Sequence, residues 1–209
     1  MLAAVALYTL LPQSLLVAPR WVVAGLELAL LVAVTVANPW RLTRATRWSR
    51  AVSVTLALLI IAANLTALGL LVSELITGSA EDPAGLLVAA LQVWATDVIA
   101  FALLFWELDR GGSVSRTQLP REQLPLADFR FSQDEDRDTV TEVSEGSSVT
   151  ADWVPTLVDY LYVSTTNSSA FSPTDTMPLT SRAKVLMGVE ATSALLTSLL
   201  VVAYAVGSL

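Results

Sequence analysis

Apolar runs of helix length dominate the sequence and limit the folds open to it. "WVVAGLELALLVAVTVANP" (residues 21–39), "AVSVTLALLIIAANLTALGLLVSELIT" (residues 51–77) and "LLVAALQVWATDVIAFALLFW" (residues 86–106) are each about as long as a helix that crosses a bilayer. Of the 209 residues, 54% are hydrophobic and only 15% are charged, and mean hydropathy is +0.62. The expected fold class is therefore an all-α integral membrane protein.

Two further apolar runs lie at the ends of the chain. Residues 181–209, "SRAKVLMGVEATSALLTSLLVVAYAVGSL", have spanning length. Residues 1–19 contain Pro12 and indicate a kinked first helix or part of a longer one. A signal peptide is the alternative there, although no basic residue precedes the apolar stretch. We expect about five membrane-spanning helices, with a four-helix membrane region in residues 1–110.

The residue types that the chain lacks exclude most catalytic and metal chemistry. It contains no His, the commonest general base and metal ligand, and no Cys for disulfides or thiolate metal sites. The net charge of −7 is unfavourable for nucleic-acid binding, which needs a basic surface. We expect no enzyme activity, no catalytic residues, no cofactor, no metal site and no nucleic-acid partner.

An arginine cluster gives the strongest orientation signal in the sequence. Four arginines recur at three-residue spacing in "WRLTRATRWSR" (residues 40–50), which places them roughly on one helical face: Arg41, Arg44, Arg47 and Arg50. Short basic segments beside membrane spans stay in the cytoplasm. The pattern therefore predicts that residues 40–50 are cytoplasmic.

A polar, acidic segment occupies residues 111–151 and has no sustained apolar period. We expect an extramembrane loop here. Its run "DEDRD" (residues 134–138) indicates a solvated charge cluster, with a divalent-ion site as the alternative. The loop comes two spans after the arginine cluster, so the same rule places it in the cytoplasm.

A helix too short to cross a bilayer is predicted after this loop. In "DWVPTLVDYLYVS" (residues 152–164), Asp152 is a candidate N-cap, Pro155 suits the first turn, and about ten apolar or aromatic positions follow. A helix that enters the membrane and stops is typical of a re-entrant segment. We expect residues 152–209 to form a re-entrant pore-type helix, a polar turn and the last membrane-spanning helix.

Residues 159–187 combine aromatic, hydroxyl and acidic residues in a distinctive order. "DYLYVSTTNSSA" is similar to an aromatic-rich pore helix that ends in a Thr-Thr pair, Asp175 lies just before "PLTSRAKVLM", and Glu190 follows. This segment, about a quarter of the chain, resembles the pore helix, filter and inner helix of the two-transmembrane potassium-channel module. The resemblance implies an ion channel that conducts monovalent cations as a homo-oligomer, with a tetramer favoured.

A second resemblance covers the chain as a whole. With "WELDRGG", "DYLY" and "AFSPTDTMPL", the chain is similar to a group of uncharacterised bacterial integral membrane proteins that carry a degenerate pore signature. This resemblance implies a multi-pass protein of the bacterial cytoplasmic (inner) membrane, in contact with membrane lipids. It implies no established activity.

The filter-like stretch differs from that of potassium channels. Potassium filters use glycines so that successive carbonyls point at the ion. "SSAFSPTD" (residues 168–175) has no glycine and contains Pro173, which fixes its own φ. We therefore expect weak cation selectivity, with capping of the short helix as the alternative role for Thr165, Thr166 and Asn167. The candidate pore residues are Thr165, Thr166, Asn167, Ser168, Ser169, Ala170, Phe171, Ser172, Pro173, Thr174 and Asp175.

The same stretch predicts a fixed polar turn. Pro173 restricts the backbone, and Asp175 is placed to accept hydrogen bonds from nearby backbone amides. The side of the membrane is a separate question, because the filter of potassium channels opens to the outside whereas the arginine cluster predicts a cytoplasmic loop. We favour the cytoplasmic side, because the four arginines are direct physical evidence of topology.

Acidic residues inside the apolar runs are the remaining signals. A charged group in a spanning helix costs about 2.5–3.5 kcal/mol, so Glu27, Asp97 and Glu190 should face protein or water. They either line a cation or proton path or make interhelical hydrogen bonds with Asn64, Thr96 or Ser193. Asp159, inside the short helix, is expected to anchor that helix to a Trp or Tyr of a neighbouring helix.

Three functions remain open from the sequence. The first is a homo-oligomeric, weakly selective cation channel lined by the polar turn. The second is a non-conducting membrane scaffold or partner subunit, in which the turn is a packing element. The third is an acid-coupled transporter that uses Glu27, Asp97 and Glu190, although no inverted repeat is visible.

Overall fold

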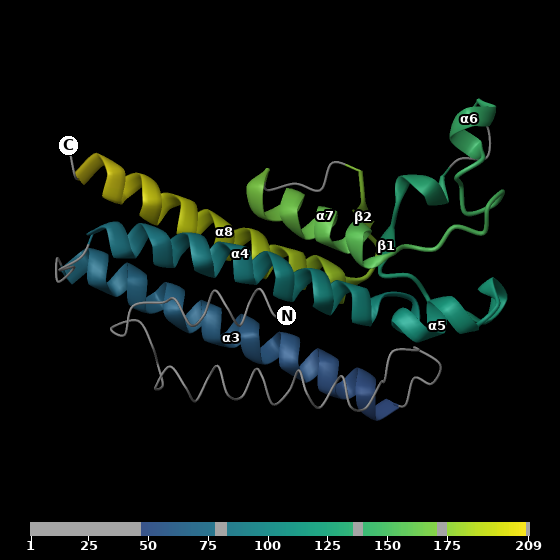
Figure 1. Cartoon of the computed structure of the whole chain (residues 1–209), viewed down its shortest axis with the longest axis horizontal. Coiled ribbons are helices and arrows are strands. Elements are labelled where there is room, and N and C mark those ends of the chain that lie inside the picture. The colour runs from purple at the N-terminus through teal and green to yellow at the C-terminus, as the bar shows by residue number, and fades with distance from the viewer. Residues whose placement is uncertain (1–46, 78–82, 136–139, 171–174, 208–209) are drawn as a thin grey trace.

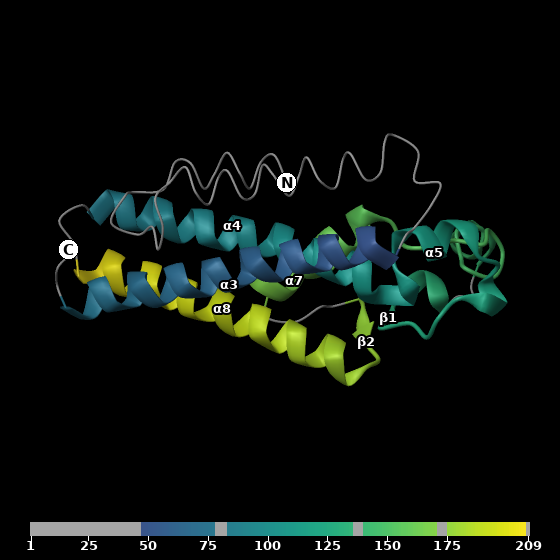
Figure 2. The ribbon, with the colours of Figure 1, turned by 90° about the horizontal axis from the view of Figure 1, so that it is seen from below.

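Three long helices form the body of the protein. The computed structural model describes residues 47–77, 83–135, 140–170 and 175–207. Within these ranges α3 (Arg47–Thr77), α4 (Pro83–Leu108) and α8 (Ser181–Gly207) run side by side, with α4 antiparallel to the other two (Figures 1 and 2). Each is long and apolar enough to cross a membrane, which agrees with the predicted helical membrane fold.

The predicted count of five spans is tested only in part. The first two expected spans, with Glu27, Arg41 and Arg44, lie outside the described residues. The three remaining spans correspond to α3, α4 and α8. The count of five therefore stays a prediction.

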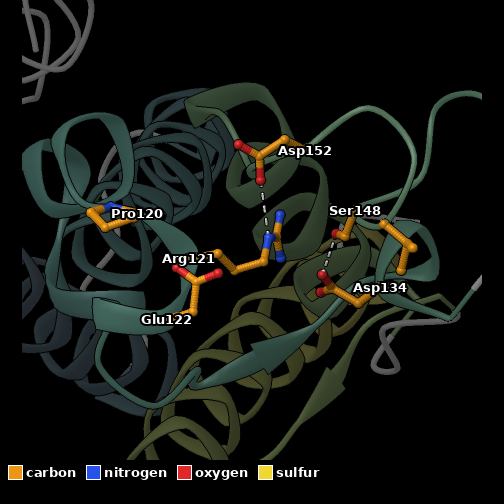
Figure 3. A pocket seen from close by; sticks show the side chains of 7 residues that line it. Pro120, Arg121, Glu122, Asp134, Ser148 and Asp152 are labelled. Atoms are coloured by element: carbon orange, nitrogen blue, oxygen red, sulfur yellow. Dashed lines mark hydrogen bonds and ion pairs between the residues drawn. The ribbon is translucent and has the colours of Figure 1, made fainter.

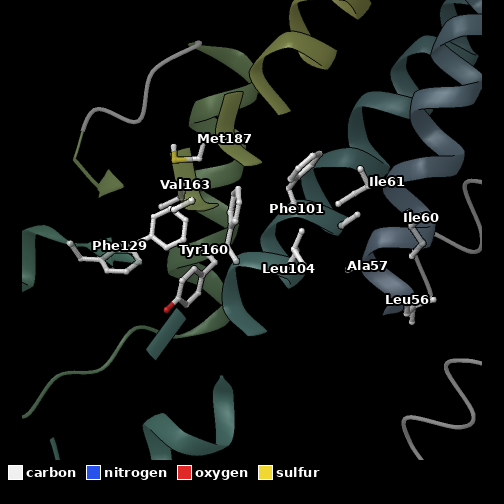
Figure 4. Close-up of a cluster of buried hydrophobic side chains, with 14 residues drawn as sticks. Leu56, Ala57, Ile60, Ile61, Phe101, Leu104, Phe129, Tyr160, Val163 and Met187 are labelled. Carbon is white, nitrogen blue, oxygen red and sulfur yellow. The ribbon is translucent and has the colours of Figure 1, made fainter. Parts of the chain in front are cut away.

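The interior of the bundle holds two apolar clusters. The larger one joins Leu56 of α3, Phe101 and Phe105 of α4, and Met187 of α8, all at most 5% exposed (Figure 4). The smaller one lies toward the other end of the bundle and includes Leu71 of α3, which is fully buried. The helices therefore contact one another along most of their length.

A short helix, α7 (Leu157–Ser169), packs against α4 and α8. Its first turn is closed by a capping box with Thr156 as the N-cap, in which Oδ2 of Asp159 accepts the Thr156 backbone N–H at 2.6 Å. The N-cap expected at Asp152 is wrong, because that residue lies outside the helix and pairs with Arg121 at 3.1 Å (Figure 3).

The polar segment after α4 is folded in part onto the end of the bundle. It contains the turns η2 (Asp109–Gly111), η3 (Arg121–Gln123) and η4 (Ser132–Asp134), the helices α5 (Ser113–Gln118) and α6 (Thr141–Ser144), and strand β1 (Phe129–Arg130). β1 pairs antiparallel with β2 (Met177–Pro178), so that Phe129 lies opposite Pro178.

Two phenylalanines explain why this segment folds onto the bundle. In "DFRF" the alternation of a strand turns Phe129 and Phe131 inward and Arg130 outward. Both rings lie edge-on against the buried Tyr160 of α7, with centroids 6.1 and 5.4 Å from its ring. The segment predicted as a solvated loop therefore contributes aromatic residues to the core.

The junction between α4 and this segment depends on two glycines. Gly111 and Gly112 have φ values of 81° and 95°, which favour glycine. A Cβ added to Gly111 would lie 2.8 Å from Cγ of Pro125. α4 ends at Leu108, and the glycines turn the chain three residues later.

Arginines from three other elements satisfy the carbonyls at the end of α4. Arg50 of α3 donates to the Glu107 carbonyl at 3.0 Å, and Arg182 of α8 donates to the Leu108 carbonyl at 3.2 Å. Arg116 of α5 donates to the next carbonyl along the chain, that of Asp109 in η2, at 2.7 Å. These cations complement the negative end of the helix dipole, and they place the starts of α3 and α8 beside the end of α4.

Acidification should weaken the fold of this end through Asp134. Its carboxylate accepts a hydrogen bond from Ser148 at 2.6 Å (Figure 3). It accepts a second one from Arg110, also at 2.6 Å. Burial opposes ionisation of Asp134 and by itself would raise its pKa. This effect is outweighed by the hydrogen bonds from Ser148 and the Phe131 N–H and by the positive charge of Arg110, so the pKa of Asp134 lies below its usual 3.8. This stabilisation is therefore complete above about pH 4 and is lost as pH falls through the lowered pKa.

Thermal unfolding of the wild type and Asp134→Asn at several pH values measures this effect. We expect Asp134→Asn to be less stable at neutral pH by no more than about 1 kcal/mol, and the difference to shrink as pH falls below about 4. Glu135→Gln, which alters an exposed pair with Arg130, is the control and should change little. An Asp134→Asn deficit that persists unchanged at pH 2 would contradict the assignment.

Candidate functional site

The polar end of α7 lies beside the middle of α8. Asn167 donates to the Met187 carbonyl at 3.0 Å. Ser168 and Ser169 share the wall of a groove with Thr197 and Ser198. α7 therefore begins at the end of the bundle where α4 ends and stops about half-way along α8 (Figure 1).

One face of α7 surrounds a buried carboxylate. Glu190 of α8 is only 1% exposed. It accepts hydrogen bonds from Asn167 Nδ2 at 2.7 Å and from Ser168 Oγ at 3.2 Å, and the Ser164 hydroxyl also contacts it. Positions 164, 167 and 168 lie on the same side of a helix, so these polar residues of α7 converge on one acid.

A second buried carboxylate links α3, α4 and α8. Asp97 of α4 accepts hydrogen bonds from Asn64 Nδ2 at 2.9 Å and from Ser193 Oγ at 2.7 Å. Asn64 also donates to Thr96 Oγ1 at 2.8 Å. These interhelical bonds are the ones that the sequence offered as the alternative to an acid-lined path. Because Ser193 lies one turn after Glu190, the two acids belong to one continuous polar zone.

The other polar residues of α7 point away from Glu190. The hydroxyls of Thr165, Thr166 and Ser169 donate to the carbonyls four residues earlier in the same helix, at 2.7 to 2.9 Å. Ser169 and Ala170 are exposed. The structure thus divides the predicted pore residues into an inward pair, Asn167 and Ser168, and an outward set.

Asp175 returns next to α7 after the turn. It is exposed and accepts a hydrogen bond from the Tyr162 hydroxyl at 3.1 Å, so in the described residues its partner is a phenol rather than the expected backbone amides. Phe171, Ser172, Pro173 and Thr174 lie outside the described residues. The fixed turn around Pro173 therefore stays a prediction.

The anchoring role expected of Asp159 belongs to Asp109. The Asp159 carboxylate caps the start of its own helix. The fully buried Asp109 instead accepts a hydrogen bond from the Tyr160 hydroxyl. Asp109 also accepts the Asp128 backbone N–H at 2.6 Å. Sequence reasoning missed Asp109 because an acid beside Arg110 and two glycines resembles a solvated helix end.

A groove of about 680 Å³ runs between α4, α7 and α8. Its walls are mostly apolar, with Leu87, Leu91 and Trp94 on one side. Among the described residues that line it, hydroxyl groups come from Ser168 and Ser169 of α7 and from Thr197 and Ser198 of α8. Ser168 therefore connects the groove to Glu190.

Comparison of the chain with protein-family models, curated proteins and solved structures finds no match. The resemblance to the potassium-channel pore module therefore rests on the quoted residues. The function is therefore inferred from the geometry of α7, α8 and the two buried acids.

Proposed function

We propose that this chain is a subunit of a homo-oligomeric, weakly selective cation channel, in which α7 is a re-entrant helix. The observation that carries this proposal is a row of exposed polar residues on the outward face of α7, beside the exposed apolar residues Val158 and Leu161. Tyr162 and Ser169 are exposed there, and Thr165 is partly exposed between them. Irregular, polar backbone half-way through a membrane is tolerated only beside protein or water. A water-filled path between subunits provides that environment.

The residues assigned to the path follow from this division of α7. Thr165, Ser169 and Asp175 offer hydroxyl and carboxylate oxygens, and α7 itself carries no Lys or Arg. Asn167 and Ser168 are excluded, because their side chains bond to Glu190. An exposed carboxylate favours cations over anions, and the absence of glycine argues against the stacked carbonyl rings of a potassium filter.

The proposed site of action is the bacterial inner membrane, with the α7 entrance on the cytoplasmic side. Every Lys and Arg in the described part of the chain lies at the start of α3, after α4 or at the start of α8, and these three places meet at one end of the bundle. By the positive-inside rule, this end is cytoplasmic.

A non-conducting scaffold or partner subunit is the second candidate. The observation in its favour is that Asn167 and Ser168, two of the predicted pore residues, bond to Glu190 and so hold α7 on α8. In that case α7 is a packing element and the outward face contacts a partner protein. Ion flux separates this candidate from the first.

Purified protein in liposomes tests the proposal. We expect potassium and sodium to pass with similar permeability, and Asp175→Ala to reduce the preference for cations over anions. Its free energy of unfolding should change by no more than about 0.5 kcal/mol, because Asp175 is exposed.

Asp152→Ala is the matched control, since this exposed acid pairs with Arg121 away from α7. It should leave selectivity unchanged. Absence of flux would favour the scaffold. A reversal potential at the potassium equilibrium value would contradict weak selectivity.

A further inference from the structure

The two buried acids have no cationic partner in the described part of the chain. Asp97 and Glu190 are 4% and 1% exposed, and the groups that bond to them are amides and hydroxyls. Two negative charges in such surroundings are strongly unfavourable unless something neutralises them.

The ionisable groups of the neighbouring helices are remote or already engaged. Lys184, six residues before Glu190 and hence about 9 Å along the axis, is exposed on a different face of α8. Arg182 binds Asp128, and Arg50 caps α4. The others on these helices are Arg47, the first residue of α3, Glu74 of α3, Glu107 of α4, Asp159, Tyr160 and Tyr162 of α7, and Tyr204 of α8. Tyr160 and Tyr162 donate to Asp109 and Asp175.

The chemistry of the surrounding groups selects a proton over a metal ion. Asn64 and Asn167 present their amide nitrogens to the carboxylates, and a nitrogen that donates a hydrogen bond cannot ligate a cation. A proton needs no further ligands. It neutralises one carboxylate and leaves the other oxygen free to accept hydrogen bonds.

The groove connects the two buried acids to the surface of the protein. Ser168 lines the groove, and its hydroxyl lies 3.2 Å from Oε1 of Glu190. Thr197 also lines the groove and donates to the carbonyl of Ser193, whose hydroxyl binds Asp97. Glu190 is therefore separated from the groove by a single hydroxyl.

We propose that Asp97 and Glu190 form a proton-binding site that exchanges protons with the groove through the Ser168 hydroxyl. A hydronium ion in the groove gives a proton to the Ser168 oxygen as the serine's own proton passes to Oε1 of Glu190, and a water molecule is left in the groove. Serine ends neutral and Glu190 ends as a carboxylic acid. The site goes beyond the proposed ion conduction and does not require it.

Infrared spectroscopy of the protein in lipid vesicles tests this site without any ion flux. We expect the C=O band of a protonated carboxyl in the wild type at neutral pH, and its loss in Glu190→Gln. Transfer to D₂O should shift the band, and Ser168→Ala should slow that shift about tenfold, as expected for losing one hydrogen-bonded relay.

Ser169→Ala is the matched control, because Ser169 lines the same groove but donates to the Thr165 carbonyl. It should exchange at the wild-type rate. A band that survives in Glu190→Gln would overturn the assignment of the proton to Glu190. Equal exchange rates in Ser168→Ala and Ser169→Ala would overturn the route, and these two variants test it even where Glu190→Gln does not fold.

Discussion

Asp109→Ala is expected to lower the free energy of unfolding by about 3–5 kcal/mol, the cost of removing one partner from a buried charged network. Asp109 is fully buried and holds the Tyr160 hydroxyl together with the backbone N–H groups of Asp128 and Phe129. Its Oδ2 also lies 3.5 Å from Arg110 Nη1. The substitution leaves the Tyr160 hydroxyl and the two backbone N–H groups without this acceptor at the point where α4, α7 and β1 meet, whereas Arg110 keeps its bond to Asp134.

Asp159→Ala is the control for this effect. Asp159 is an acid of the same size fifty residues later, but it serves an exposed capping box, so its loss should cost only about 1 kcal/mol. Chemical unfolding in detergent, followed by circular dichroism, measures both variants. Equal losses would show that the Asp109 network does not hold this end of the protein together.

Glu190→Ala is expected to destabilise the protein by about 3 kcal/mol or more, because it leaves buried donors without acceptors. Ser164, Asn167 and Ser168 all bond to this carboxylate, and only Ser164 and Asn167 keep a second acceptor, so α7 should also be held less firmly on α8. Limited proteolysis of α7 and thermal unfolding in detergent measure the two effects together.

The size of the Glu190 effect is judged against two other variants. Glu190→Gln keeps an oxygen acceptor and should cost less than half as much as Glu190→Ala. Thr192→Ala removes an exposed hydroxyl of α8 that bonds only to the Gly188 carbonyl, and should be nearly neutral. A Glu190→Ala protein as stable as Thr192→Ala would mean that α7 is held by its apolar contacts alone.

Features encoded locally could be predicted from the sequence. The apolar runs predict α3, α4 and α8 because membrane helices need only length and hydropathy. "DRGG" predicts the end of α4 because the chain needs positive φ there. The bonds of Asn64 and Ser193 to Asp97 could be expected, because a polar group in an apolar helix must find a partner on a neighbour.

Features that depend on long-range pairing could not be predicted. Asp109 and Tyr160 are 51 residues apart, and nothing near either residue identifies the other. Phe129 and Phe131 stand in a polar segment, so their burial depends on the surface that α7 offers them. Which hydroxyl groups of α7 bond to Glu190, and which face outward, likewise depends on where α8 lies.

Thiol modification of Ser169→Cys tests the central claim, a water-filled cation path along the outward face of α7. The chain has no native Cys, so a charged, membrane-impermeant thiol reagent reacts only at the new position. Ser169 is exposed at the inner end of α7, and Ser73→Cys, exposed near the far end of α3, is the matched control. The proposal predicts that the reagent blocks cation flux through Ser169→Cys channels in liposomes and spares Ser73→Cys and the wild type. Modification of Ser169→Cys that leaves the flux unchanged, or a wild type that carries no flux, would contradict it.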